Sequence, residues 1–144
     1  MPTKKKVSTR TKQDFDLMMV KQVMQKQVRA VHLKTKGDVV ASLMDEGFGA
    51  VPVVDSKDKL LGIVSEHDLL AALDDGHKLG AVAAGDIMTC NPYSIHPEAM
   101  LPTLVHVLRA SDLIRVPVVD AKDRLVGIIA RRDVLRAYLS VGRA

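Results

Sequence analysis

Two short segments of this chain carry residue types that could bind a ligand. Residues 65–68 (SEHD) and 130–133 (ARRD) each follow an apolar run and end on an aspartate. If each segment begins a helix, its unpaired backbone N–H groups can bind an anion. The carboxylate of Asp68 or Asp133 can then accept hydrogen bonds from two vicinal hydroxyls. The alternative is helix capping by Ser or Asp, which explains one polar residue per segment but less well the recurring aspartate.

Two other chemistries match the residue types but not their spacing. Ser65, His67 and Asp68 could suggest a hydrolase, but neighbours at one helix start do not converge as a catalytic triad does, and no Gly-x-Ser-x-Gly segment occurs. The five histidines, at positions 32, 67, 77, 96 and 106, lack the spacing of zinc ligands. We therefore expect no catalytic residue, no metal ligand and no cofactor.

Both segments lie within a longer internal repeat. Residues 51–73 read VPVVDSKDKLLGIVSEHDLLAAL, and residues 116–138 read VPVVDAKDRLVGIIARRDVLRAY. Upstream, residues 22–33 align with residues 86–97. Such a duplication predicts two similar units related by pseudo-twofold symmetry. The expected organisation is a basic tail at 1–16, a first repeat at 17–75, a linker at 76–85, a second repeat at 86–140 and a C-terminal end at 141–144.

Each repeat has the pattern of a β-α-β-β-α unit. A short strand is expected at 28–33 or 93–96, followed in the first repeat by a helix that Asp38 caps and Gly47 closes. The apolar runs VPVVD and LLGIV predict two buried strands joined by the turn SKDK, with the last helix directly after them. We therefore expect an α/β (α+β) protein whose small sheets are covered by helices.

Composition favours a folded protein with its positive charge concentrated at one end. Apolar residues make up 47% of the chain, and the net charge is +4. Residues 1–13 contain basic but no acidic residues, so the remainder is close to neutral, and no aromatic residues interleave with the lysines as in a nucleic-acid site. No apolar run approaches the length of a membrane span, and Cys90 is the single cysteine. We expect no signal peptide. We expect a cytoplasmic protein without membrane contact.

The repeated pattern VPVVD-x-K-D-x-L-x-G-Ile-x-(Ser/Ala)-x-x-Asp resembles the cystathionine-β-synthase (CBS) domain over about residues 17–140. Two such domains in tandem form a Bateman module. The resemblance implies a regulatory protein, not an enzyme, that binds an adenine nucleotide (AMP, ADP or ATP) in clefts between its repeats. It would signal in trans to an unknown effector protein through the shape of a homodimer. Three alternatives stay open: a ligand-free dimerisation scaffold, another adenosyl ligand, and nucleic-acid binding through the tail.

Carried over residue by residue, the resemblance implies a first cleft in which Asp133 holds ribose. Arg115 and Arg132 would face phosphate there, since a guanidinium binds phosphate through a planar fork. Ala130 replaces a hydroxyl residue of the family pattern, and the arginines could compensate. This cleft should therefore prefer more phosphates. Its expected residues are Lys36, Val40, Phe48, Gly49, Arg115, Ile128, Arg132 and Asp133.

The resemblance implies a second cleft in which Asp68 holds ribose. Ser65 and His67 would face phosphate, and apolar side chains would border the base. Met100 stands where a small hydroxyl residue is common in the family, as Lys36 does in the first cleft. The expected residues are Ile63, Ser65, His67, Asp68, Met100, Leu113 and Ile114.

The last helix of each repeat is apolar on more than one face, as DLLAAL and DVLRAYL indicate. One face can pack on a sheet, but the other needs a second cover. An isologous contact with another copy of the chain would supply it. We therefore expect a homodimer with Leu69, Leu73, Val134 and Tyr138 at its interface.

Overall fold

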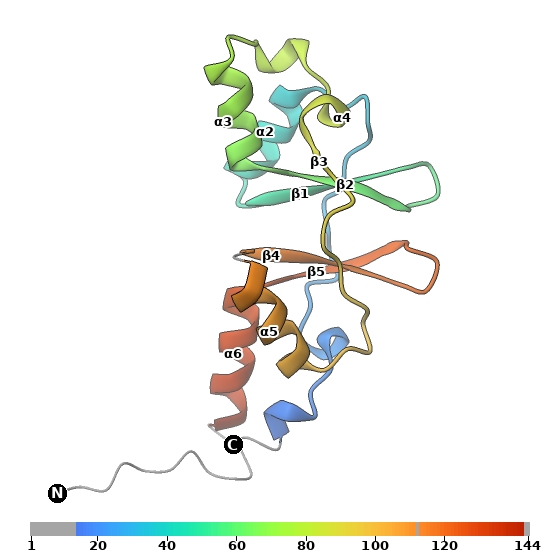
Figure 1. Ribbon diagram of the computed structural model, residues 1–144, viewed down its shortest axis with the longest axis vertical. Helices are drawn as coiled ribbons and strands as arrows, with labels where there is room; N and C mark the ends of the chain where they lie inside the picture. Colours follow the sequence, from blue (N-terminus) through green and yellow to red (C-terminus); the bar gives the residue numbers. More distant parts are fainter. Residues whose placement is uncertain (1–13, 112, 143–144) are drawn as a thin grey trace, which may run out of the picture.

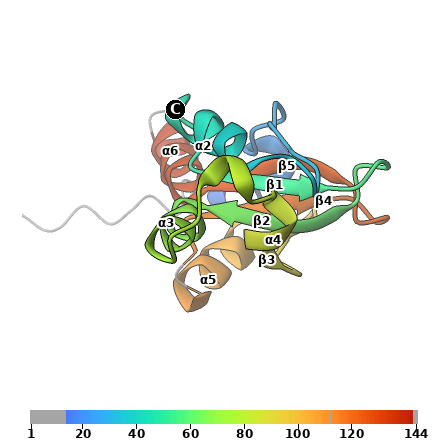
Figure 2. The same ribbon diagram turned by 90° about the horizontal axis from the view of Figure 1, so that it is seen from above.

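Two small antiparallel sheets lie in the middle of the molecule, with helices on their outer sides (Figure 1). The computed structural model describes residues 14–111 and 113–142. Each sheet is built on one hairpin, and the two hairpins lie side by side with their turns at the same edge (Figures 1 and 2). The expected α+β class, with small sheets covered by helices, is confirmed.

The strands follow the two copies of the repeat. The first sheet has the order β1-β2-β3, and the second contains β4 and β5, all antiparallel. The valines of the VPVV runs are buried in both copies because these runs lie between helices and the opposite strands. The strand bounds are β1 (Ala50–Val54), β2 (Leu60–Ser65), β3 (Thr89–Cys90), β4 (Arg115–Val119) and β5 (Leu125–Ala130).

The helices form one group at each end of the molecule (Figure 1). The group beside β1 and β2 consists of α2 (Gly37–Asp45), α3 (Glu66–Asp74), the short 3-10 helix η2 (Leu79–Ala81) and α4 (Ala84–Ile87). The group beside β4 and β5 consists of the 3-10 helix η1 (Val20–Gln22), α5 (Leu101–Ser111) and α6 (Arg131–Gly142).

The predicted ends of the first long helix are half right. Gly47 follows the helix with a φ of 109°, the left-handed conformation that glycine favours, as expected. Asp38 is not the N-cap: the N-cap is Lys36, and Asp38 lies within the first turn, where its Oδ1 accepts the Val39 N–H at 2.9 Å. The helix begins earlier because the Gly37 N–H donates to the Val82 carbonyl at 2.9 Å, which fixes the chain there.

The expected short strands at 28–33 and 93–96 are reduced to single parallel bridges. Val31 bridges Val53, and Ile95 bridges Val118. The Val31 N–H donates to the Pro52 carbonyl at 2.9 Å, and its carbonyl accepts the Val54 N–H at 2.9 Å. Proline has no N–H to extend this ladder.

The segment that leads into each repeat packs on the core of the other repeat. Val20, fully buried in η1, belongs to the cluster that contains β4, β5, α5 and α6, and Met24 packs against this cluster. Conversely, Ala84 is fully buried in the cluster of β1, β2, α2 and α3, and Met88 packs there. The two cores are therefore joined by two crossing segments, which hold the sheets in a fixed relation.

The two hairpin turns also bind each other. The Leu60 N–H donates to the Asp123 carbonyl at 3.0 Å, and the Leu125 N–H donates to the Asp58 carbonyl at 2.9 Å. The backbones of Lys59 and Arg124 form an antiparallel β-bridge between the turns. This symmetric contact fixes the hairpins relative to each other at the edge away from α3 and α6 (Figure 1).

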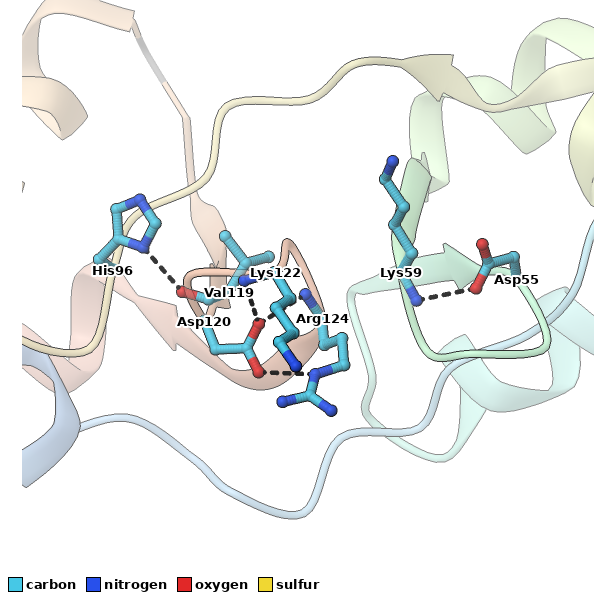
Figure 3. A network of polar contacts seen from close by, with 7 residues as sticks. All are labelled: Asp55, Lys59, His96, Val119, Asp120, Lys122 and Arg124. Atoms are coloured by element: carbon cyan, nitrogen blue, oxygen red, sulfur yellow. Dashed lines mark hydrogen bonds and ion pairs between the residues drawn. The ribbon is translucent and has the colours of Figure 1, made fainter.

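Each turn is held by an aspartate at its start (Figure 3). Asp55 Oδ1 accepts the Lys57 and Lys59 N–H groups at 2.8 and 2.9 Å, and these hydrogen bonds, chiefly that of Lys59, lower the pKa of Asp55. Asp120 accepts the Arg124 N–H at 3.0 Å and the Arg124 Nε–H at 2.9 Å, and the backbone hydrogen bond of Arg124 is the main cause of its lowered pKa. The repeated segments KDK (57–59) and KDR (122–124) therefore form the hairpin turns.

The glycine in the middle of β2 allows a second segment to cross it closely. A Cβ added at Gly62 would lie 2.7 Å from the Thr89 carbonyl oxygen and 2.5 Å from the Met88 sulfur. A Cβ added at Gly127 in β5 would lie 2.6 Å from the Met24 sulfur and 3.0 Å from the Gln25 carbonyl oxygen. The repeated Gly-Ile pair therefore marks the two places where the crossing segments lie on the sheets.

Replacing Gly62 by alanine should lower the free energy of unfolding by about 1–3 kcal/mol, because the backbone of β3 must shift to make room. Urea denaturation would measure it. Gly80→Ala is the matched control, since a Cβ there meets only the flexible Asp38 side chain, at 3.3 Å. Equal stability of the two variants would contradict the close crossing at Gly62.

Candidate functional site

A pocket of about 470 Å³ lies between the two sheets, and we call it the intersheet pocket. One wall comes from the first repeat, with Ile63 and Ser65 of β2 and the first turn of α3. The other wall comes from residues 113–115, at the start of β4, and from residues 91–93. Most of its surface is apolar. It thus brings together five residues of the expected second cleft: Ile63, Ser65, Asp68, Leu113 and Ile114.

Asp68 and Ser65 form a reciprocal cap at the start of α3. The Ser65 N–H donates to Asp68 Oδ2 at 2.8 Å, and the Asp68 N–H donates to Ser65 Oγ at 3.2 Å. This capping box explains why the aspartate stands three positions into the turn. It also makes the Ser65 hydroxyl an acceptor within the turn. In the described part of the chain no side chain donates to Asp68, so Oδ1 can accept from a ligand.

Arg115 supplies the positive charge of the intersheet pocket. Arg115 and Gly49 are expected in the first cleft, but both line the intersheet pocket. The guanidinium lies over Gly49, where an added Cβ would collide with it. The charged groups of the lining are Arg115 and two carboxylates, Glu66 and Asp68.

Two residues of the expected first cleft, Ile128 and Asp133, contact Gln25, a residue that the sequence did not single out, and line neither the intersheet pocket nor the depression beside Gln25. Gln25 exchanges both backbone hydrogen bonds with Ile128, at 2.9 and 3.0 Å. Its side-chain nitrogen lies 3.3 and 3.4 Å from the two carboxylate oxygens of Asp133. Gln25 and Phe48 share the lining of a more open depression of about 660 Å³ with residues 26, 27 and 29.

Several expected ligand residues lie away from both hollows. Val40 is fully buried in the core of the first repeat, and Lys36 is the N-cap of α2, bridged to Ala83. Met100 lies directly before α5 and forms a β-bridge with Met19. Neither Lys36 nor Met100 lines the intersheet pocket. His67 and Arg132 are exposed in the first turns of α3 and α6.

The expected dimer residues divide into buried and exposed ones. Leu69 and Val134 are buried in the cores of their own repeats, 6% and 5% exposed. Tyr138 is partly buried, and its ring packs edge-on against Phe15, with ring centres 5.4 Å apart. Leu73 is exposed. The outward faces of α3 and α6 are formed instead by Leu70, Leu73, Leu135 and Leu139.

The repeat alignment contains the signal for the residues that were missed. Residues 22–33 align with 86–97, which sets Gln25 against Thr89. In the structure Thr89 pairs with Ile63 as Gln25 pairs with Ile128, and Thr89 and Tyr93 line the intersheet pocket. The segment that crosses each sheet therefore contributes to a hollow, which composition alone does not indicate.

Neither a membrane span nor a metal site is found in the described residues. Within 14–111 and 113–142, no helix is long and apolar enough to cross a bilayer. The same residues contain no group of three or more His, Cys, Asp or Glu side chains placed to hold a metal ion.

Comparison with known proteins finds the same duplicated unit. The CBS domain family matches residues 20–75 and 84–140. A CBS domain-containing protein of Dictyostelium discoideum is 30% identical over 135 residues, which cover 86% of this chain and 93% of that protein. Other curated relatives are longer, and the match spans only 20% to 58% of their length; they include enzymes.

Solved structures agree with this match. The CBS-pair protein CBSX2 of Arabidopsis thaliana superposes with a TM-score of 0.79 at 30% identity, over 88% of this chain and 97% of its own. The structure of CBSX2 in complex with AMP superposes with a TM-score of 0.76 at 28% identity, over 85% of this chain and 97% of its own. The CBS domain pair of MJ0100, in complex with 5′-methylthioadenosine and S-adenosyl-L-methionine, superposes with a TM-score of 0.76 at 27% identity, over 89% of this chain and 99% of its own. With the family matched over both repeats, this chain belongs to the CBS domain family and carries two CBS domains in tandem.

Proposed function

We propose that this chain is a regulatory protein, not an enzyme, that binds an adenine nucleotide in the intersheet pocket. The observation that carries the proposal is the position of Asp68 and Arg115 in one largely apolar hollow of about 470 Å³. Pockets that hold small ligands have this size and this mixture of apolar walls with a few polar groups.

Each part of a nucleotide has a matching part of the pocket. Ile63, Leu113 and Ile114 offer apolar walls to the faces of the base. Asp68 Oδ1 can accept hydrogen bonds from the ribose hydroxyls while Oδ2 keeps the cap of α3. Arg115 can bind a phosphate, and the start of α3 adds its own attraction for an anion.

The charges of the lining favour few phosphates. Glu66 and Asp68 are acidic and Arg115 is the single basic residue of the lining, so each added phosphate meets more repulsion than attraction. We therefore propose AMP rather than ATP as the preferred nucleotide. The same acidic balance supports a second candidate, the cationic ligand S-adenosylmethionine, which shares the adenosyl group.

The relatives support an adenosyl ligand without choosing between these two. CBSX2 has been solved with AMP, and the MJ0100 pair with 5′-methylthioadenosine and S-adenosylmethionine. All of these ligands contain an adenine base and a ribose with vicinal hydroxyls. The groups proposed to recognise them are the apolar walls and Asp68.

Thermal melting with a panel of ligands tests the proposal. AMP, ADP, ATP, S-adenosylmethionine and a short RNA would each be added to the protein. A ligand at 100 times its dissociation constant should stabilise the protein by about 2.7 kcal/mol. We expect AMP to raise the melting temperature most. A shift with RNA alone would point to the basic tail, and no shift with any ligand would contradict the proposal in favour of a scaffold.

Arg115→Ala should remove the preference for AMP over adenosine, because the remaining charged groups of the lining are acidic. The measurement is the ratio of the two dissociation constants in the native protein and in the variant. Arg124→Ala is the control, since Arg124 lies at the hairpin turn and is bound to Asp120. An unchanged ratio in Arg115→Ala would remove this residue from the phosphate site.

We also propose that the protein works as a homodimer and acts in trans on an effector protein. The leucines on the outward faces of α3 and α6 support a self-contact, because both helices lie at one edge of the molecule, opposite the hairpin turns (Figures 1 and 2). Ligand binding would shift the population of dimer shapes that the effector recognises. The exposed thiol of Cys90 suits the reducing cytoplasm, the compartment we propose.

A further inference from the structure

The two aspartates at the helix starts are in different states. Asp133 is only 6% exposed, and Oδ2 accepts the Ala130 N–H at 2.8 Å. The Gln25 amide nitrogen lies within 3.4 Å of both carboxylate oxygens. Asp68 accepts the corresponding backbone N–H from Ser65, yet no side chain of the described residues donates to it. One carboxylate is thus already occupied by a donor of the protein itself.

The position of Gln25 is fixed by the backbone. Both of its main-chain hydrogen bonds go to Ile128, and its carbonyl lies against Gly127, so the residue cannot move along β5. From that place its side chain reaches Asp133. Thr89 holds the equivalent place opposite Ile63 in the other repeat, but its side chain is shorter and makes no hydrogen bond to Asp68.

We infer that Gln25 closes the first cleft to adenosyl ligands, so that the chain binds one ligand per monomer, in the intersheet pocket. The amide nitrogen of Gln25 lies 3.3 and 3.4 Å from the two carboxylate oxygens of Asp133, on the side from which vicinal ribose hydroxyls would have to donate. A ligand would have to break this charge-assisted contact and would gain only a similar one in exchange. At Asp68 a ligand would not have to displace a donating side chain of the described residues. The inference rests on the proposed function, because it concerns which of two related hollows takes the same ligand class.

The test exchanges the two residues and counts binding sites by calorimetry with AMP. The native protein should bind one AMP per chain. Gln25→Thr should bind two, because Asp133 then becomes available. Thr89→Gln should weaken the native site at least tenfold, and the double exchange should restore one site, now at Asp133. Melting temperatures close to that of the native protein would show that the exposed side-chain changes leave the fold intact.

The outcomes separate this inference from the proposed function. Two sites in the native protein, or one unchanged site in Gln25→Thr, would overturn the role of Gln25 while the proposed function stands. One site in Gln25→Thr but none in the native protein would support the role of Gln25 and contradict binding in the intersheet pocket. No binding by either protein would overturn both.

Discussion

Asp68→Ala should weaken AMP binding at least about tenfold, and up to about a hundredfold. Hydrogen bonds to a charged group contribute about 1.5–3 kcal/mol each, and a difference of 1.4 kcal/mol changes a dissociation constant tenfold. Asp68 lies in the lining of the intersheet pocket, and its Oδ1 has no donor among the described side chains. Isothermal titration calorimetry with AMP would give the dissociation constants directly.

Asp133→Ala is the matched control for this measurement. Both aspartates accept the N–H of the residue three positions earlier, at 2.8 Å, so both variants lose an equivalent cap contact, worth about 0.5–2 kcal/mol of stability. Only Asp68→Ala should lose affinity, because Asp133 is engaged by Gln25. Equal affinities for the native protein and a folded Asp68→Ala variant would exclude Asp68 from the site.

The second large effect is expected on assembly. Leu73→Glu combined with Leu139→Glu should convert a dimer into a monomer at micromolar concentration. Leu73 and Leu139 are about half exposed on the outward faces of α3 and α6. Burying an unpaired carboxylate costs several kcal/mol, so two per chain should raise the dimer dissociation constant more than about a hundredfold.

Light scattering on a size-exclusion column would measure this effect. The native protein should show about twice 15.7 kDa, and the double variant 15.7 kDa. Leu33→Glu is the control, because Leu33 is 44% exposed but lies outside both helices. A native protein that is monomeric, or a double variant that stays dimeric, would contradict an interface on α3 and α6.

The repeated sequence motifs predicted the fold and the second of the two expected clefts, because these motifs determine local structure. The VPVV and LxGI runs form the expected hairpins, and Ser65 and Asp68 cap the helix that follows. Their nearness to Leu113 and Ile114 follows from the paired repeats, which the family resemblance already implied. Five residues of the predicted second cleft therefore line one pocket.

The sequence did not predict those positions of site residues that depend on tertiary contacts. A continuous β-branched run does not show which side of a strand faces which hollow, and Arg115, expected in the first cleft, lines the intersheet pocket. The helix starts at Lys36 and Met100 lie beside crossing segments that only the folded chain brings there. The contact between Gln25 and Asp133 spans 108 positions in the sequence, and no local pattern encodes it.

A crystal structure of the protein with bound AMP would test the central proposal most directly. We expect the nucleotide in the intersheet pocket, with both ribose hydroxyls within hydrogen-bond distance of Asp68, the base against Ile63 and Ile114, and the phosphate near Arg115. Asp133 should keep its contact with Gln25. AMP bound elsewhere, or bound in the pocket with its ribose turned away from Asp68, would contradict the proposal.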